Sequence, residues 1–366
     1  MKNFNEHTMA VFSAMNTNYD AMNNLMTDVA LGREIYDAES DRKISKAEAN
    51  EKILDFSRQI LGITDINDAK EVRRALRDNK QEWFDIIEET VNTVVTVGLQ
   101  ESDWFNELVD SKTIGYHDRI DFYSEDDALL SVAKAGTSQH DHVLQRLSAG
   151  QKITIPTSLH VIKVGADINK YVTGQVDWTK LVDAIAKAYL ADIQAEIFAQ
   201  VATAITALPA AFKSTGTLVE TTLDNIIENV SMANNGADVT IMGTRTAIAA
   251  ITSIYNVSWA ANALKDNMMN SGNIGIYKGT RLIVIPNRFK TANNYAANNK
   301  VFTDQLLIMP TIGNEGKFIK YIEEGDIQIL ERMDRGDYTS DLQTYEVQRR
   351  YGTGVVLGRK FGSWIL

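Results

Sequence analysis

The chain of 366 residues contains no cysteine and only four prolines. Without cysteine it forms no disulfide, and thiolate metal ligands and cysteine nucleophiles are excluded. The lack of thiols fits a reducing compartment. Each proline stands near a predicted element boundary, where the missing N–H is least harmful; the four are Pro156, Pro209, Pro286 and Pro310.

The sequence is also short of basic residues and of long apolar runs. Lysine and arginine number 37 against 48 aspartates and glutamates, for a formal net charge of -11. Such a chain is a poor candidate for gripping nucleic acid, because phosphate binding needs clustered Lys and Arg. No stretch approaches the ~18 consecutive apolar residues of a membrane helix, and residues 1–16 lack the apolar segment of a signal peptide. We therefore expect a cytoplasmically made protein with no membrane partner.

Sequence motifs of catalysis are scarce. No glycine-rich loop ends in Gly-Lys-Ser/Thr, which argues against P-loop chemistry. Five histidines leave Ser–His–Asp catalysis open by residue type, but no Gly-x-Ser-x-Gly elbow is present. Residues 352–358 approach the dinucleotide fingerprint, yet the third glycine comes one residue late and no helix is expected to follow. We expect these glycines to form a turn between strands.

Candidate metal and acid–base groups have simpler interpretations. His140 and His142 flank Asp141, and two imidazoles at this spacing can bind zinc, but no third ligand is marked by its position. The pairs 126–127 and 323–324 are adjacent carboxylates, for which solvated turns are the commoner explanation. We therefore predict no catalytic residue, no cofactor site and no metal site, and a protein that is not an enzyme.

Two short surface motifs are treated in the same way. Arg335, Gly336 and Asp337 spell a cell-adhesion tripeptide, which here is better explained as turn chemistry. Asn229 and Asn256 each begin a glycosylation sequon, but nothing in the sequence indicates secretion.

The strongest positive feature is a long amphipathic helix over residues 177–207. At ~1.5 Å per residue it spans about 45 Å, enough to cross most of a domain. Its apolar residues recur every three or four positions and form one stripe along the helix: Trp178, Val182, Ile185, Tyr189, Ile193, Ile197, Val201, Ile205 and Leu208.

Residues 1–97 are predicted to be helical and mostly polar. Ser45 is placed as an N-cap with Glu48 three residues later, and Gly62 follows the end of that helix. The charge pattern indicates an arm of separate helices rather than a compact domain. The three expected helices cover residues 45–61, 68–79 and 81–97.

The remainder alternates between strands and helices. Residues 114–123 and 151–164 predict two strands of an extended hairpin, joined by a long polar stretch. Residues 216–316 predict a mixed α/β domain, with helices at 222–234 and 244–255 and buried strands at 239–242 and 282–286. Residues 317–332 and 344–351 predict a long two-stranded ribbon, and an apolar tail follows at 355–366.

The order of these parts, together with three sequence phrases, resembles a known family. The phrases are Ile-Met-Gly-Thr-Arg at 241–245, Gly-Ile-Tyr-Lys-Gly-Thr-Arg-Leu-Ile-Val at 275–284, and Gly-Val-Val-Leu-Gly-Arg-Lys-Phe at 354–361. The chain looks like an HK97-type major capsid protein of a tailed bacteriophage, with the resemblance best over residues 100–366. Residues 1–97 depart from the shortest members of the family.

The resemblance implies an α+β, HK97-like fold with an N-terminal helical arm, an extended E-loop hairpin, a P-domain and an axial α/β A-domain. The P-domain would hold the long helix and the long β-strands. The implied boundaries are 1–97 for the arm, 98–112 for a bridge, 113–174 for the E-loop, 175–215 and 317–353 for the P-domain, and 216–316 and 354–366 for the A-domain.

The resemblance also implies the function of a structural major capsid protein. Copies would assemble as hexamers and pentamers into an icosahedral head in the host cytoplasm, with portal, scaffold and decoration proteins as further partners. Double-stranded DNA would lie inside without sequence-specific binding, and the protein would reside in the virion. The alternative is an encapsulin-like shell of a cellular nanocompartment, and an unrecognised α/β enzyme is the third interpretation.

Several residues receive assembly roles on this basis, each beside a simpler one. Trp104 and Phe105 would lie across a partner subunit or in the core. The strand residues Ile153, Ile155 and Val161 would face a neighbour or the subunit body, or only pair within the hairpin. Lys152 and Lys163 would cross-link subunits or serve as surface charge.

Overall fold

The computed structural model divides the chain into two compact units. The first comprises Met1–Glu101, Ser158–Asp192 and Gly325–Tyr351, and the second comprises Ser102–Thr157, Ile193–Glu324 and Gly352–Leu366. The structure describes residues 6–14, 19–36, 43–65, 68–124, 151–166, 178–254, 275–290, 294–296, 299–311, 317, 319–332, 343–355 and 360–366.

The first unit begins with a group of helices whose ends are set by local side chains. They are α1 (Glu6–Ala14), α2 (Tyr19–Leu31), α3 (Lys46–Leu61) and α4 (Ala69–Gln100), with the short strands β1 (Ile35–Tyr36) and β2 (Lys43–Ile44) between α2 and α3. The Ser45 hydroxyl accepts the Glu48 N–H, and the Glu48 carboxylate accepts the Ser45 N–H. Gly62 ends α3 in the left-handed conformation. The predicted capping box and stop signal are confirmed.

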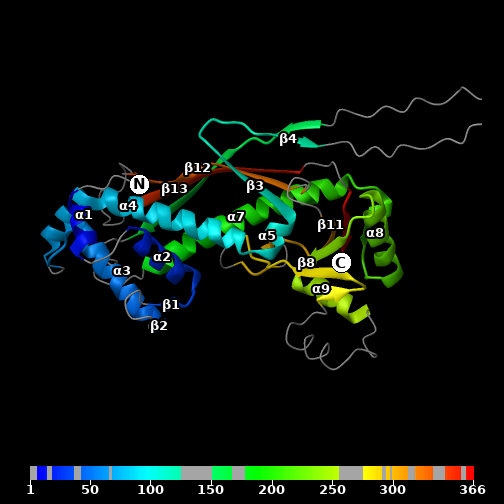
Figure 1. Cartoon of the computed structure of the whole chain (residues 1–366), viewed down its shortest axis with the longest axis horizontal. Helices are drawn as coiled ribbons and strands as arrows, with labels where there is room; N and C mark the ends of the chain where they lie inside the picture. The colour runs from blue at the N-terminus through cyan, green and yellow to red at the C-terminus, as the bar shows by residue number, and fades with distance from the viewer. Residues whose placement is uncertain are drawn as a thin grey trace, which may run out of the picture. The chain divides into compact units, whose positions relative to one another are not determined.

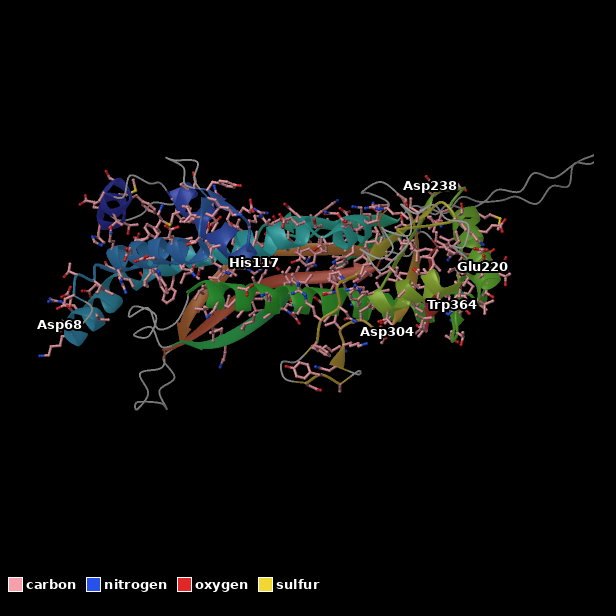
Figure 2. All side chains as sticks on the ribbon, turned by 90° about the horizontal axis from the view of Figure 1, so that it is seen from below. Asp68, His117, Glu220, Asp238, Asp304 and Trp364 are labelled. Atoms are coloured by element: carbon pink, nitrogen blue, oxygen red, sulfur yellow. The ribbon has the colours of Figure 1, made fainter. Side chains whose placement is uncertain are left out.

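Helix α4 corrects the prediction of two helices at 68–79 and 81–97. It is continuous, and its N-cap Asp68 (Figure 2) accepts the N–H groups of Lys70 and Glu71. Residues 69–97 contain neither glycine nor proline, so nothing in the backbone interrupts the helix. Asn79, at the predicted break, instead donates its side-chain N–H to the Leu61 carbonyl at 3.0 Å and satisfies the end of α3.

The N-terminal helices also pack together, so the prediction of separate helices is wrong. Helices α2 and α3 contact each other and α4, and α1 contacts α3 (Figure 1). The His7 ring reaches the last carbonyls of α3 at 3.1 and 3.2 Å. All four helices bury apolar residues, and the periodicity of each helix alone does not show which others it contacts. Among the buried residues are Phe12, Met26, Val29, Ile53, Phe56, Ile60, Trp83, Ile86, Val91 and Val95.

The long helix α7 (Trp178–Thr206) confirms the predicted element within one residue at each end. From Val182 to Leu208 every residue of the predicted stripe is buried, while the side chain of Trp178 lies outside the described part. Its first half belongs to the first unit and its second half to the second. In the first unit, the Tyr189 hydroxyl donates to the Val347 carbonyl at 2.8 Å, and burial raises the pKa of that hydroxyl.

A four-stranded sheet has the strand order β3-β12-β13-β6. Its strands are β3 (Val109–Ile114), β12 (Ile319–Arg332), β13 (Gln343–Val355) and β6 (Ser158–Ala166). β6 pairs antiparallel with β13, and β3 pairs parallel with β12. β12 and β13 are hydrogen-bonded neighbours, which agrees with the predicted long ribbon.

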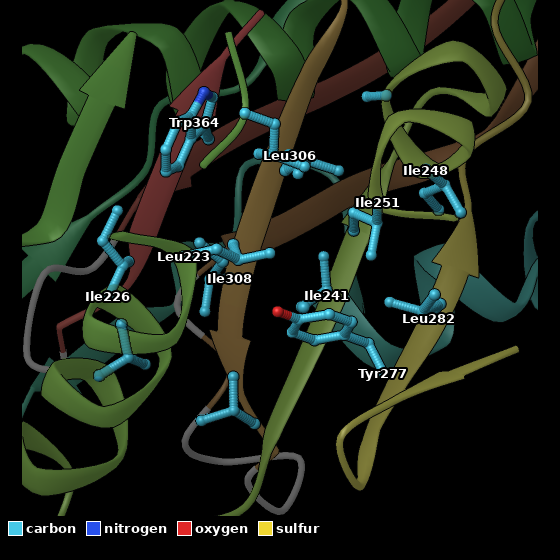
Figure 3. Packing of buried hydrophobic residues seen from close by; sticks show 14 residues of the cluster. Leu223, Ile226, Ile241, Ile248, Ile251, Tyr277, Leu282, Leu306, Ile308 and Trp364 are labelled. Atoms are coloured by element: carbon cyan, nitrogen blue, oxygen red, sulfur yellow. The ribbon is translucent and has the colours of Figure 1, made fainter. Parts of the chain in front are cut away.

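The second unit contains a six-stranded mixed sheet in the order β7-β14-β11-β8-β10-β9. Its strands are β7 (Lys213–Thr215), β8 (Val239–Gly243), β9 (Ile276–Tyr277), β10 (Thr280–Val284), β11 (Gln305–Pro310) and β14 (Gly362–Ile365). Helices α8 (Glu220–Ala233) and α9 (Arg245–Ile254) pack their apolar residues against these strands (Figure 3). The predicted α/β domain is therefore present, and the apolar tail forms one of its strands.

Four strand predictions need correction. Residues 114–123 hold the end of β3 and the start of β4 (Asp121–Ser124) rather than one strand. Residues 151–164 form β5 (Gln151–Thr154) and β6, separated around Pro156, which has no N–H for a ladder. The strand predicted at 282–286 begins two residues earlier as β10. Gly352 and Gly354 lie inside β13 rather than in a turn.

Two shorter elements complete the second unit. Residues 98–112, predicted as a bridge, include the helix α5 (Asp103–Leu108). A 3-10 helix, η1 (Ala210–Phe212), follows Pro209. Among the helices that the structure describes, none has both the length and the apolarity to span a bilayer.

Candidate functional site

The β4–β5 hairpin is the element that most clearly stands apart from the two larger sheets. β4 and β5 form their own antiparallel two-stranded sheet, in which Phe122 pairs with Ile153 and Tyr123 pairs with Lys152. Alternation therefore gives the hairpin two different faces. Phe122 is buried and Ile153 half-buried on one face, whereas Tyr123, on the other face, is 70% exposed.

The buried face of the hairpin joins a small apolar cluster in the second unit. The cluster consists of Ile114, Phe122, Ile155 and Ile322, with Ile120 and Ile153 packed against it. These residues come from β3, β4, β5, β12 and the segments that lead into and out of the hairpin. The hairpin is thus anchored at its base by apolar contacts, and Ile155 faces the subunit body as one of the two predictions had it.

A buried ion pair stands beside this cluster. The Lys320 ammonium on β12 lies 2.7 Å from the Asp110 carboxylate on β3, and the two side chains are only 5% and 13% exposed. The same ammonium lies 5.4 Å from the centre of the Phe122 ring, and that of Lys112 lies 5.1 Å from it. Both separations fall within the range of cation–π attraction, so Phe122 is held by charge as well as by packing.

Glu324 connects both arms of the hairpin to β12. Its carboxylate accepts the backbone N–H of His117 at 3.0 Å, on the segment that enters the hairpin (His117 is labelled in Figure 2). The other oxygen accepts the hydroxyl proton of Thr157, on the segment that leaves it. Glu324 is only 5% exposed, so these bonds form where water competes weakly. We call Glu324, His117 and Thr157 the hairpin clamp.

Two glycines of β13 allow the close approach of the segment that leaves the hairpin. A Cβ atom on Gly352 would lie 2.2 Å from the backbone oxygen of Pro156. One on Gly354 would lie 2.8 Å from the side chain of Ile155. Only glycine fits this contact, which explains the glycines that had suggested a nucleotide-binding loop.

The exposed face of the hairpin carries an ion pair of its own. Lys152 lies 2.6 Å from Asp121, and Thr154 also donates to this carboxylate. The hydrogen bond from Lys152 lowers the pKa of the Asp121 carboxyl and raises that of the lysine.

The structure decides between the two roles considered for Trp104 and Phe105. Both are buried, at 5% and 3% exposure. The Trp104 ring stacks on Phe198 at 5.7 Å, and Phe105 meets Tyr321 edge-on at 6.1 Å. The role in the core is confirmed, and a contact of these rings with a partner subunit is wrong.

Other predicted residues are separated or lie elsewhere. Glu323 and Glu324 do not form a carboxylate pair at a turn, because neighbours on a strand point to opposite faces. Asn229 lies on α8, where its amide donates to the Ala211 carbonyl. Val161 is exposed on β6, as is Lys163. His140–His142, the 126–127 pair, Arg335–Asp337 and Asn256 lie outside the described residues, and within the described part no cluster of metal-ligand residues occurs.

Sequence reasoning missed Asp110, Lys320 and the role of Glu324. One signal was available in the sequence for Lys320: it stands among the apolar residues Ile319, Tyr321 and Ile322, and the structure buries residues 319–322. A lysine in such a run requires a buried acidic partner, but a single sequence does not show which acid on another strand supplies it.

Comparison with known proteins agrees with the resemblance. The sequence matches the model of the family described as "SPbeta prophage-derived putative capsid protein YonB" over residues 21–365. No curated protein matches the chain.

Solved structures similar to the chain are shells of phages and of a virus-like particle. The mature capsid of bacteriophage PhiM1 shares 13% identity, with 72% of this chain and 86% of that chain covered and a TM-score of 0.47. The structure from Microbacterium phage Oxtober96 shares 11% identity, with 72% of this chain and 90% of that chain covered and a TM-score of 0.46. The virus-like particle from Pyrococcus furiosus shares 12% identity, with 75% of this chain and 98% of that chain covered and a TM-score of 0.42.

The family match covers nearly the whole chain and confirms the resemblance to phage capsid proteins. The observed mixture of a long helix, long strands, a separate hairpin and an α/β sheet agrees with the HK97-like fold that the resemblance implied. On the match over residues 21–365, the chain belongs to the SPbeta prophage-derived YonB family of capsid proteins and is a structural shell protein.

Proposed function

We propose that this capsid protein is the major subunit of an icosahedral phage head. Copies assemble as hexamers and pentamers, and the closed shell encloses the double-stranded DNA genome. A closed shell repeats a few kinds of contact many times, so each contact is weak while the whole is stable. The family match supports the shell role, and the β4–β5 hairpin supports the assembly mechanism.

The observation that carries the mechanism is the hairpin's isolation as a two-stranded sheet with a fixed base. Two-stranded hairpins are at best marginally stable in water, so this one gains stability from further contacts along its length. Tyr123, on the face away from the apolar cluster, is 70% exposed, and tyrosine is enriched at protein interfaces. A neighbouring copy of the chain is the partner that a shell supplies to every subunit.

The same proposal assigns roles to the parts of the chain. Residues 113–174 form the E-loop that reaches a neighbour, residues 175–215 and 317–353 form the P-domain, and residues 216–316 and 354–366 form the A-domain. Residues 98–112 connect the E-loop to the helical arm of residues 1–97. Because the arm has its own buried core, we propose that it is retained in the shell or its lining.

The charge of the chain suits a wall around DNA. A net charge of -11 repels phosphate, so the genome packs against the subunits without being gripped at particular sequences. We propose that assembly takes place in the host cytoplasm, with portal, scaffold and decoration proteins as partners, and that the finished subunit resides in the virion.

Electron microscopy of the purified full-length chain tests the proposal. We expect hollow particles of uniform size in negative stain, and light scattering far above that of a single chain. Particles isolated from the producing cell should protect double-stranded DNA from nuclease. Particles that hold protein cargo and no DNA would favour the encapsulin-like alternative, and a chain that stays monomeric under all conditions would refute both.

A further inference from the structure

Three side chains of the first unit, unrelated to the hairpin clamp, form a Ser–His–Asp relay. The Ser158 Oγ lies 2.9 Å from His160 Nε2, and His160 Nδ1 lies 2.7 Å from Asp192 Oδ2. Ser158 and His160 are two residues apart on β6 and so point to the same face, and Asp192 comes from α7. No sequence motif marks this site, because the acid lies 32 residues beyond the histidine.

The hydrogen bonds of the relay are mutually consistent in one protonation pattern. An ionised Asp192 carboxylate is an acceptor only, so His160 Nδ1 carries the proton of their bond. His160 Nε2 is then the unprotonated ring nitrogen, and it accepts the hydroxyl proton of Ser158. This tautomer is assigned from the network, and it is the arrangement in which a histidine acts as a base toward a serine.

Tyr351 fixes the histidine and the acid in place. Its ring is stacked on the His160 ring at 3.9 Å between centres, with 12° between the planes. Its hydroxyl donates to the same Asp192 oxygen that binds His160. Tyr351 is fully buried, whereas the side chain of His160 is 22% exposed. A base that is packed on one side and bonded on the other is preorganised for proton transfer.

The serine is open to reagents from solution. Ser158 is exposed, and among the described strands β6 is an edge strand of the sheet with the order β3-β12-β13-β6. Asp192 is 53% exposed as well. The relay is therefore a surface site, where a small reactive compound has direct access to the hydroxyl.

We propose that Ser158 is an activated nucleophile that accepts an acyl group from a reactive carboxylic ester. The Ser158 oxygen forms a bond to the carbonyl carbon while its proton moves to His160 Nε2. The bond from that carbon to the alcohol oxygen then breaks, and the departing oxygen takes the proton from His160. The products are acyl-Ser158 and the free alcohol. His160 is the base, and Asp192 is a positioning residue that holds its tautomer.

The test uses the purified full-length chain and p-nitrophenyl acetate. We expect release of p-nitrophenolate with one acetyl group added per chain, and peptide mapping should place that group on Ser158. Ser158→Ala removes the adduct. His160→Phe keeps a ring to stack on Tyr351 but removes the base, so we expect acetylation of Ser158 to slow by about a hundredfold.

Controls separate a reactive serine from a structural hydrogen-bond network. Ser111→Ala, at an exposed serine of β3, should leave the acetylation rate unchanged. Wild-type chain unfolded in urea should lose the preference for Ser158, and this measurement does not depend on any variant folding. Equal rates in wild type and His160→Phe, or acetylation spread evenly over lysines, would overturn the proposal.

Discussion

At the scale of single residues, the Lys320–Asp110 pair illustrates the cost of burying charge. Desolvation disfavours each ion alone, and the pair is tolerated because the two groups lie 2.7 Å apart in nearly complete burial. By contrast, Lys152 and Asp121 form a pair at 2.6 Å whose side chains are 57% and 34% exposed. The two ion pairs should therefore contribute differently to stability, although their distances are similar.

Neutralising one partner of each pair tests this difference. We expect Asp110→Asn to lower the free energy of unfolding by about 3–5 kcal/mol, because the buried Lys320 ammonium loses the carboxylate that lies 2.7 Å from it. Asp121→Asn, the surface control, should lower it far less, because water screens an exposed ion pair. Urea unfolding of unassembled chain measures both. If the two substitutions lowered the free energy of unfolding equally, burial would not determine how much an ion pair contributes to stability.

The base of the hairpin also shows what residue types alone predict. Alternation and apolar composition left open whether Ile155 faces a neighbour, the subunit body or only the hairpin, and the structure places it in the apolar cluster of the subunit body. The clamp was not predictable, because Glu324 binds residues that precede and follow the hairpin and lie 207 and 167 positions away in the sequence. Such contacts depend on strand register, and a single sequence carries no record of which distant segments are neighbours.

At the scale of elements, a glycine in a strand and a glycine in a helix differ in how much space they leave for a side chain. Gly352 in β13 leaves room for the Pro156 carbonyl. Gly98 lies in the last turns of α4, where a Cβ would meet only the end of the Leu190 side chain at 3.3 Å. A backbone atom cannot move aside for an added Cβ, whereas a flexible side chain can. The same substitution to alanine should therefore change stability in opposite directions at the two positions.

Alanine at each position makes this comparison. We expect Gly352→Ala to destabilise the chain by roughly 1–3 kcal/mol, because the strand and the Pro156 segment must move apart. Gly98→Ala should be neutral or stabilise by up to about 1 kcal/mol, because alanine favours the helix and Leu190 is able to rotate. Thermal unfolding of the two variants reports the sign. A stable Gly352→Ala chain would contradict the close approach of Pro156 to β13.

Helices were predicted better than strands for a physical reason. Caps and the 3.6-residue period are local, so α3 and α7 were identified nearly to the residue. The error at α4 came from reading a polar stretch as a break, although it held no helix-breaking residue. Strand β11 (Gln305–Pro310) was missed, although its residues 306–309 form a short apolar run like those predicted as buried strands at 239–242 and 282–286. Periodicity alone cannot assign such a run to a strand or a helix.

At the scale of the whole molecule, the order of elements carried more information than any motif. The long helix, the hairpin, the α/β segment and the late ribbon were each weak indications, but their sequence along the chain resembled one family, and the family match confirmed it. The packing of α1–α4 was not foreseen, because the apolar residues of one helix do not show which other helices they contact.

Residues 125–150 connect β4 to β5 in the sequence. Ser124 and Gln151 are paired across the two strands, so an Asn-Gly turn is able to replace residues 125–150 directly. The apolar cluster and the clamp stay intact in this variant, and we therefore expect normal helical content and unfolding. Assembly should fail or give irregular particles, because the segment proposed to reach a neighbour is gone.

A Gly-Ser segment of equal length is the matched control: it keeps the length of residues 125–150 but removes the contacts of their side chains. Negative-stain microscopy of the three chains separates the outcomes, and uniform particles from the shortened chain would contradict the assembly role of the hairpin.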